Sequence, residues 1–68
     1  MERYEITVDS TVGPVVLAAL EGFEVVEVAG GHSRLVGSVI DQAAFYGMLN
    51  RLHDLRLEIV EIHRMDDT

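Results

Sequence analysis

The chain has 68 residues, 49% of them apolar, and its five basic and twelve acidic side chains give a formal net charge of −7. It contains no cysteine, which excludes disulfide scaffolds, thiolate metal sites and cysteine nucleophiles. The negative charge disfavours nucleic acid and anionic lipid, and no apolar run is long enough for a membrane span or a signal peptide. We therefore expect a cytoplasmic chain with no nucleic-acid partner, no membrane partner and no cofactor.

The first predicted elements are a strand and a short helix. Residues 4–9 alternate apolar and polar side chains, which is the period of a half-buried strand. Pro14 then suits the first turn of a helix, and Gly22 closes that helix. The apolar side of the strand carries Tyr4, Ile6 and Val8. The helix can turn Val16, Leu17 and Leu20 towards a sheet, which leaves Val15, Ala18 and Ala19 outside.

A β-hairpin is predicted next. Residues 23–29 and 33–40 read as its arms, and Gly30-Gly31 between them is the strongest turn signal in the chain. The first arm does not alternate cleanly, so either both of its faces are covered or a bulge shifts its register. In the second arm Gly37 shares a face with Leu35 and Val39, and it indicates a bulge or close packing of a helix above it.

The last predicted elements are an amphipathic helix and a strand. Asp41 is the expected N-cap of a helix that ends at Asp54. Its apolar residues at helical spacing are Phe45, Met48, Leu49, Leu52 and Leu55. Residues 57–64 follow as a strand, in which either Leu57 and Ile59 or Val60 and Ile62 face the helices and the other pair lies on the open face.

This βαββαβ order predicts an α+β fold of the ferredoxin-like plait type. Right-handed crossovers with a hairpin between them give a four-stranded antiparallel sheet of order 4-1-3-2, with both helices on one face. We expect residues 1–65 to form a single domain and residues 66–68 to form a short acidic tail.

The second helix also resembles a known sequence pattern. The run VIDQAAFYGML from Val39 to Leu49, followed by the pairs RL and DL, resembles short uncharacterised bacterial ferredoxin-like proteins with a DQAALHGLLxRLxDLGL-type helix. The match covers roughly Leu35 to Arg64. The chain has Tyr46 where those proteins usually carry histidine, and Arg56 where they usually carry a helix-ending glycine. The resemblance implies a fold and no activity.

Histidine and glutamate are the candidate residues for metal binding and acid–base chemistry. His32, His53 and His63 lack the spacing of metal ligands, and solvated histidines are the more typical interpretation. His63 shares one face of the last strand with Glu61, which makes a conceivable acid–base or metal pair. We assign no catalytic residue and no metal ligand, so the sequence favours a role other than catalysis.

Two glutamate pairs lie in the predicted edge strands. Glu24 and Glu27, like Glu58 and Glu61, are three residues apart, so each pair is expected to point to opposite faces of its strand. Carboxylates on edge strands discourage pairing with unintended partners, and we favour that interpretation over an acid–base dyad.

The segment from Asp9 to Val15 is the most site-like stretch. Free N–H groups at a helix start can bind a carboxylate, which makes Ser10, Thr11 and Gly13 candidate ligand-binding residues. The segment loosely resembles the strand–loop–helix start of ACT domains, small plaits that bind amino acids between copies, although its Gly-Pro order reverses their usual Pro-Gly. An ordinary turn with a proline start is the alternative.

Apolar residues fall on more faces than one small core needs, which indicates self-association. We expect the open face of the sheet to pack on a second copy, and another protein is a further candidate partner. The candidate interface residues are Val15, Ala19, Val26, Ile59 and Glu61. The sequence therefore predicts a small non-catalytic homo-oligomeric interaction or scaffold module, a homodimer or larger. The alternative is an ACT-like domain that senses an amino acid or carboxylate near the Asp9–Val15 loop.

Overall fold

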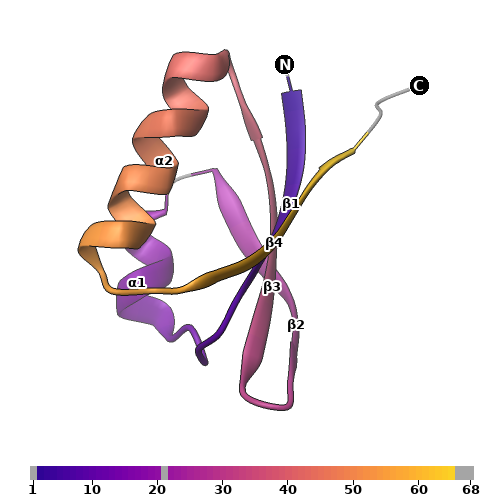
Figure 1. Cartoon of the computed structure of the whole chain (residues 1–68), viewed down its shortest axis with the longest axis vertical. Helices are drawn as coiled ribbons and strands as arrows, with labels where there is room; N and C mark the ends of the chain where they lie inside the picture. Colours follow the sequence, from indigo (N-terminus) through magenta and orange to yellow (C-terminus); the bar gives the residue numbers. More distant parts are fainter. Residues whose placement is uncertain (1, 21, 66–68) are drawn as a thin grey trace.

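A computed structural model describes residues 2–20 and 22–65. Its strands are β1 (Glu2–Val8), β2 (Phe23–Ala29), β3 (His32–Val39) and β4 (Ile59–Met65), and its helices are α1 (Pro14–Ala19) and α2 (Gln42–Asp54). The strands form one antiparallel sheet of order β2-β3-β1-β4, and both helices lie on the same face of it (Figure 1). This is the predicted βαββαβ plait, with the order 4-1-3-2 read from the other edge. The predicted acidic tail, residues 66–68, lies outside the described residues.

The core lies between the sheet and the helices. Tyr4, Ile6 and Val8 of β1 are buried, which confirms the predicted alternation of this strand. The α1 helix starts at Pro14, as expected, and it is only six residues long. Val16 and Leu17 on its inner side are half-buried against the core, and Val15 and Ala18 on its outer side are exposed, as the apolar pattern predicted. Ala19 was also expected outside, which is wrong, because it is half-buried at the end of the helix. Such a short helix covers little of the sheet.

The longer helix, α2, has the predicted N-cap and ends at the predicted residue, Asp54. The Ala44 backbone N–H donates to Oδ1 of Asp41 at 2.8 Å, which satisfies one of the free donors at the helix start. Phe45, Met48 and Leu52 on its inner side are buried. The Tyr4 ring of β1 stacks on the Phe45 ring, with 3.9 Å between ring centroids. These contacts seat α2 over β1 and β3.

Glycines in the turn and in β3 explain the geometry of the hairpin. Gly30 and Gly31 have φ angles of +60° and +81°, which confirms the predicted turn. Gly37 of β3 is covered by Phe23 of β2, because a Cβ at Gly37 would lie 2.5 Å from Cγ of Phe23 and closer still to the Gly22 carbonyl. Close packing above Gly37 is therefore confirmed, but the prediction that a helix supplies it is wrong, because the covering group is an aromatic ring from the neighbouring strand.

A bulge interrupts β2. Val25 lies opposite Leu35, but the next paired residue, Glu27, lies opposite Arg34, so Val26 is an extra residue in the strand. Residues opposite each other in neighbouring strands share a face of the sheet. Glu24 and Glu27 therefore both lie on the open face, away from the helices. The prediction that they point to opposite faces is wrong, because the bulge adds one residue between them.

A second bulge has the same effect in β4. Ile62 lies opposite Ile6 and Ile59 lies opposite Val8, and both β1 residues are buried under the helices. Val60 is the extra residue. The expectation that either Ile59 or Ile62 would lie on the open face is wrong, because the bulge turns both isoleucines towards the helix side.

The open face of the sheet is mainly polar. Arg34 lies 3.5 Å from Glu27 and 3.9 Å from Glu5, and the side chains of Thr7 and Glu61 continue this row across the sheet. Val36 is the buried apolar residue on this face. The expectation that this face is apolar is therefore wrong, since one bulge adds a carboxylate to it and the other removes an isoleucine from it. Packing of this face on a second copy stays a prediction.

Candidate functional site

The predicted ligand loop is tied to the sheet. Ser33 is fully buried, and its hydroxyl donates to the Ser10 carbonyl at 2.7 Å and accepts from the Val12 N–H at 3.0 Å. Thr11 is exposed, and a Cβ at Gly13 would meet nothing within 4 Å. The three candidate residues thus share one loop whose hydrogen bonds serve to hold it on β3. Its role in ligand binding stays a prediction.

The five predicted interface residues are spread over the molecule. Val15 on α1 is 86% exposed, and Val26 is the bulged residue of β2. Ala19 at the end of α1 is half-buried, and its carbonyl accepts a hydrogen bond from Nη1 of Arg51 at 2.9 Å. Ile59 and Glu61 lie on β4, at the opposite edge of the sheet from β2. Val15 and Ala19 are four residues apart on α1 and so share one side of that helix, whereas Ile59 and Glu61 lie on the two faces of β4. The structure therefore does not bring the five residues into one surface.

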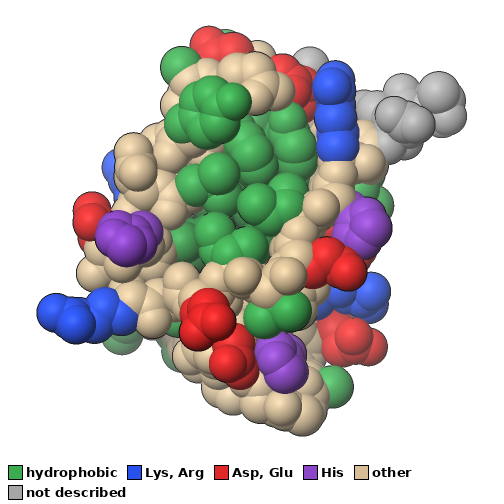
Figure 2. Space-filling model, in the orientation of Figure 1, with side chains coloured by type: hydrophobic (Ala, Val, Ile, Leu, Met, Phe, Trp, Pro, Cys, Tyr) green, Lys and Arg blue, Asp and Glu red, His purple; other side chains and the backbone are tan. Residues whose placement is uncertain are grey.

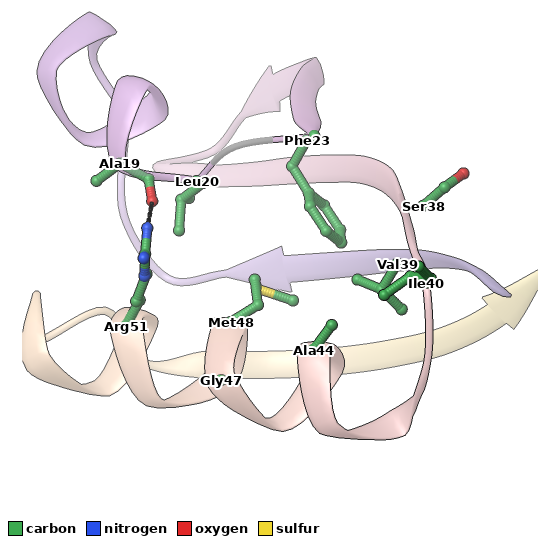
Figure 3. A pocket seen from close by; sticks show the side chains of 11 residues that line it. Ala19, Leu20, Phe23, Ser38, Val39, Ile40, Ala44, Gly47, Met48 and Arg51 are labelled. Carbon is green, nitrogen blue, oxygen red and sulfur yellow. Dashed lines mark hydrogen bonds between the residues drawn. The ribbon is translucent and has the colours of Figure 1, made fainter. Parts of the chain in front are cut away.

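A hollow of about 390 Å³ lies between the end of α1 and α2 (Figure 3). Leu20, Phe23, Val39 and Met48 supply its apolar lining, and small residues of α2 leave it open. The Arg51 side chain crosses it to reach the Ala19 carbonyl. This contact satisfies a carbonyl at the end of α1 and fixes the spacing of the two helices.

A second apolar region, an open surface, lies on the other side of α2. In Figure 2, hydrophobic side chains form a continuous area between α2 and the β4 edge, bordered by charged and histidine side chains. From here on the α2–β4 surface means Tyr46, Leu49, Leu57, Ile59 and Ile62. Leu49, Leu57 and Ile59 are half-buried against the core, whereas Tyr46 is 59% exposed and Ile62 is 41% exposed.

Helical spacing explains why α2 faces β4 with these residues. Gln42, Tyr46 and Leu49 lie at positions i, i+4 and i+7, so they form one stripe along the helix. Gln42 hydrogen-bonds Glu2 and Tyr4 of β1, which shows that this stripe looks towards the β1 and β4 side of the sheet. The opposite flank of α2 lines the hollow near α1.

A polar cluster closes one end of the α2–β4 surface. Oε1 of Glu2 accepts from the Tyr4 hydroxyl at 2.8 Å and from Nε2 of Gln42 at 2.6 Å, and it lies 3.9 Å from Nη2 of Arg64. The bond from Tyr4 is the main cause that lowers the pKa of Glu2, with help from Gln42 and Arg64. The same bond raises the pKa of Tyr4. The cluster connects β1, α2 and β4.

The β4 strand is an edge of the described sheet, with β1 on one side and no strand on the other. On its open face Oε1 of Glu61 lies 3.0 Å from Nε2 of His63, which confirms the predicted sharing of a face. Both side chains are more than half exposed. Within residues 2–20 and 22–65, no group of three or more histidine, aspartate and glutamate side chains is arranged to hold a metal ion. Neither described helix has the length and apolar content that crossing a membrane requires.

Sequence reasoning missed the residues that shape this region. Ile62 was expected to share a face with Val60, and Tyr46 was seen only as part of the polar face of its helix. The bulge in β4 moved Ile62, and the pattern of residues 57–64 did not reveal it. The bulge in β2, by contrast, was one of the two explanations given for the broken alternation of residues 23–29, and the structure confirms it. The buried Ser33 hydroxyl was also missed, because its partners are more than twenty residues away in the chain.

Comparison with known proteins gives one match. Residues 3–63 match a family model described as Domain of unknown function (DUF8691). No curated protein and no solved structure matches the chain.

Proposed function

We propose that this chain, which belongs to the family described as Domain of unknown function (DUF8691), is a small non-catalytic protein-interaction module that self-associates. The α2–β4 surface is the observation that carries this proposal. It leaves large apolar side chains exposed beside the core, at an edge of the sheet where a neighbouring chain has access.

The surface is open because the fold has too little helix to cover its sheet. The α1 helix is six residues long, and α2 is seated over β1 and β3. The helix side of β4 is left with only the flank of α2 beside it, so Ile62 stays 41% exposed although its neighbour Ile6 is fully buried. A second chain packed here removes apolar area from water and strengthens a domain whose own core is small.

The test is the mass of the protein in solution across a concentration series, measured by sedimentation velocity. We expect the chain to be a dimer or larger at low micromolar concentration. Ile62→Asp places a charge in the α2–β4 surface, and we expect it to weaken self-association by about a hundredfold. Ile62 is only 41% exposed, so each of the two copies contributes about 1.4 kcal/mol, less than the full burial of an isoleucine.

The matched control is Val28→Asp. Val28 lies on β2, at the other edge of the sheet, and it is exposed to a similar extent, 50% against 41% for Ile62. We expect this variant to associate as the unchanged chain does. A chain that stays folded and monomeric at high micromolar concentration contradicts the proposed function.

A further inference from the structure

We infer that the partner at β4 is a second copy of this chain, which adds its own β4 edge to edge in the antiparallel sense, with a two-fold axis at Ile62. This inference rests on the proposed function and names the mode of self-association. The two sheets then become one continuous sheet with all helices on the same side.

The backbone of β4 is available for such pairing. In the order β2-β3-β1-β4 the strand is the last one, so the N–H and C=O groups on its outer side have no strand partner in the described sheet. Residues 61–65 are paired regularly with β1, whereas the bulge at Val60 ends the regular stretch. An added strand satisfies the outward backbone groups, which is the usual source of affinity in strand addition.

Side-chain charge selects one register. Residues opposite each other must share a face, so a symmetric pair of β4 strands is centred on a residue. A centre at Glu61 sets two carboxylates against each other, and a centre at His63 sets Ile62 against Arg64. A centre at Ile62 instead sets Glu61 of each copy against His63 of the other. On this register the open face carries two acid–histidine pairs around the axis.

The helix side agrees with the same register. Ile62 of one copy lies opposite Ile62 of the other, at a Cβ separation of about 4.5–5.5 Å. Both isoleucines point to the helix side of the sheet, where Tyr46 is exposed and Leu49 is half-buried, since Ile62 shares its face with the buried Ile6. The two α2–β4 surfaces therefore meet at the axis, and each covers the apolar gap of the other.

The first experiment uses two oppositely charged variants of the full chain. One carries Glu61→Lys with His63→Lys, and the other carries His63→Glu, so that each faces like charges in its own dimer. We expect each variant alone to associate about tenfold more weakly than the unchanged chain, and an equal mixture to form heterodimers as tight as the original dimer. Native mass spectrometry measures both, and circular dichroism checks that these exposed substitutions leave the fold intact.

The second experiment uses the absence of cysteine in the chain. Ile62→Cys places two thiols next to each other at the axis, so mild oxidation is expected to give a cross-linked dimer. Val15→Cys on α1 is the control, because its side chain is 86% exposed but lies away from β4. We expect its cross-linked yield to be about tenfold lower at the same protein concentration.

The outcomes separate this inference from the proposed function. If the unchanged chain is dimeric but both charge variants associate as it does and mix statistically, self-association stands and the β4 pairing is wrong. Equal cross-linking of Ile62→Cys and Val15→Cys also contradicts the pairing. A monomeric unchanged chain overturns the proposed function itself, and the pairing with it.

Discussion

The two edge strands of the sheet use the same backbone device with opposite contents. In β2 the bulge at Val26 places Glu24 and Glu27 on one face, and in β4 the bulge at Val60 places Ile59 and Ile62 on one face. The first bulge gathers carboxylates on the open face, whereas the second gathers apolar side chains on the helix side. One extra residue thus places carboxylates at one edge of the sheet and apolar side chains at the other, where we propose that a second copy binds.

The edges also differ in how well the chain itself covers them. Phe23 at the start of β2 is buried and lies over Gly37, so this end of the edge strand is packed within the monomer, although residues 26–29 are exposed. In β4, by contrast, Ile59 is half-buried and every residue from Val60 to Met65 is exposed. We therefore expect the monomer to depend on β2 packing for stability and on β4 for association.

The largest effect is expected at the packed edge, from Gly37→Ala. The added Cβ would overlap the Phe23 ring and the Gly22 carbonyl, and the backbone there cannot move without disturbing the β2–β3 pairing. We expect a loss of about 2–3 kcal/mol in the free energy of unfolding, measured by urea denaturation.

Gly47→Ala is the matched control for that substitution. A Cβ at Gly47 meets nothing within 4 Å, and alanine in a helix interior is favoured over glycine by about 1 kcal/mol. We expect this variant to be more stable than the unchanged chain. Similar stability for the two variants would show that Phe23 does not hold the β2 edge.

The second prediction turns the protected edge into a pairing edge. Glu24→Lys places a lysine on the same face of β2 as Glu27. The lysine of one copy can then pair with Glu27 of another, as Glu61 and His63 are proposed to pair between two β4 strands. A chain with two pairing edges forms open-ended assemblies instead of closed dimers. We expect association through β2 to tighten by about tenfold, seen as a rise in weight-average mass with concentration.

Glu24→Gln removes the carboxylate without adding a positive charge, and we expect it to have a much smaller effect on mass. If Glu24→Lys leaves the mass at that of the unchanged chain, charge is not what keeps β2 from pairing.

The sequence pattern predicted the sheet order and the core, but it missed the surface that distinguishes the edges. The alternation of Tyr4, Ile6 and Val8, the Gly30-Gly31 turn and the Asp41 cap are local signals, since each is set by neighbouring residues. A bulge is different, because it exists only relative to the strand beside it. For that reason Glu24 and Glu27, and likewise Ile59 and Ile62, were wrongly predicted to lie on opposite faces of their strands.

The third and smallest prediction concerns one connection next to each edge strand, the turn after β2 and the segment before β4. The turn after β2 has glycine at both positions of positive φ, whereas the connection from α2 to β4 has Arg56 at a φ of 61°. A residue with a Cβ is disfavoured in this left-handed region.

We expect Arg56→Gly to raise the free energy of unfolding by at most about 1 kcal/mol, because relief of the left-handed strain is partly offset by the greater freedom of glycine in the unfolded chain. Urea denaturation at a concentration where the chain is monomeric measures it, and Arg56→Ala, which keeps a Cβ, controls for the loss of the side chain. Equal stability of the glycine and alanine variants would show that the connection to β4 carries no backbone strain. A gain for glycine alone means that the β4 edge is held by a connection less suited to its backbone than the Gly30-Gly31 turn. The difference between the two edge strands would then include the backbone of their neighbouring connections as well as their side chains.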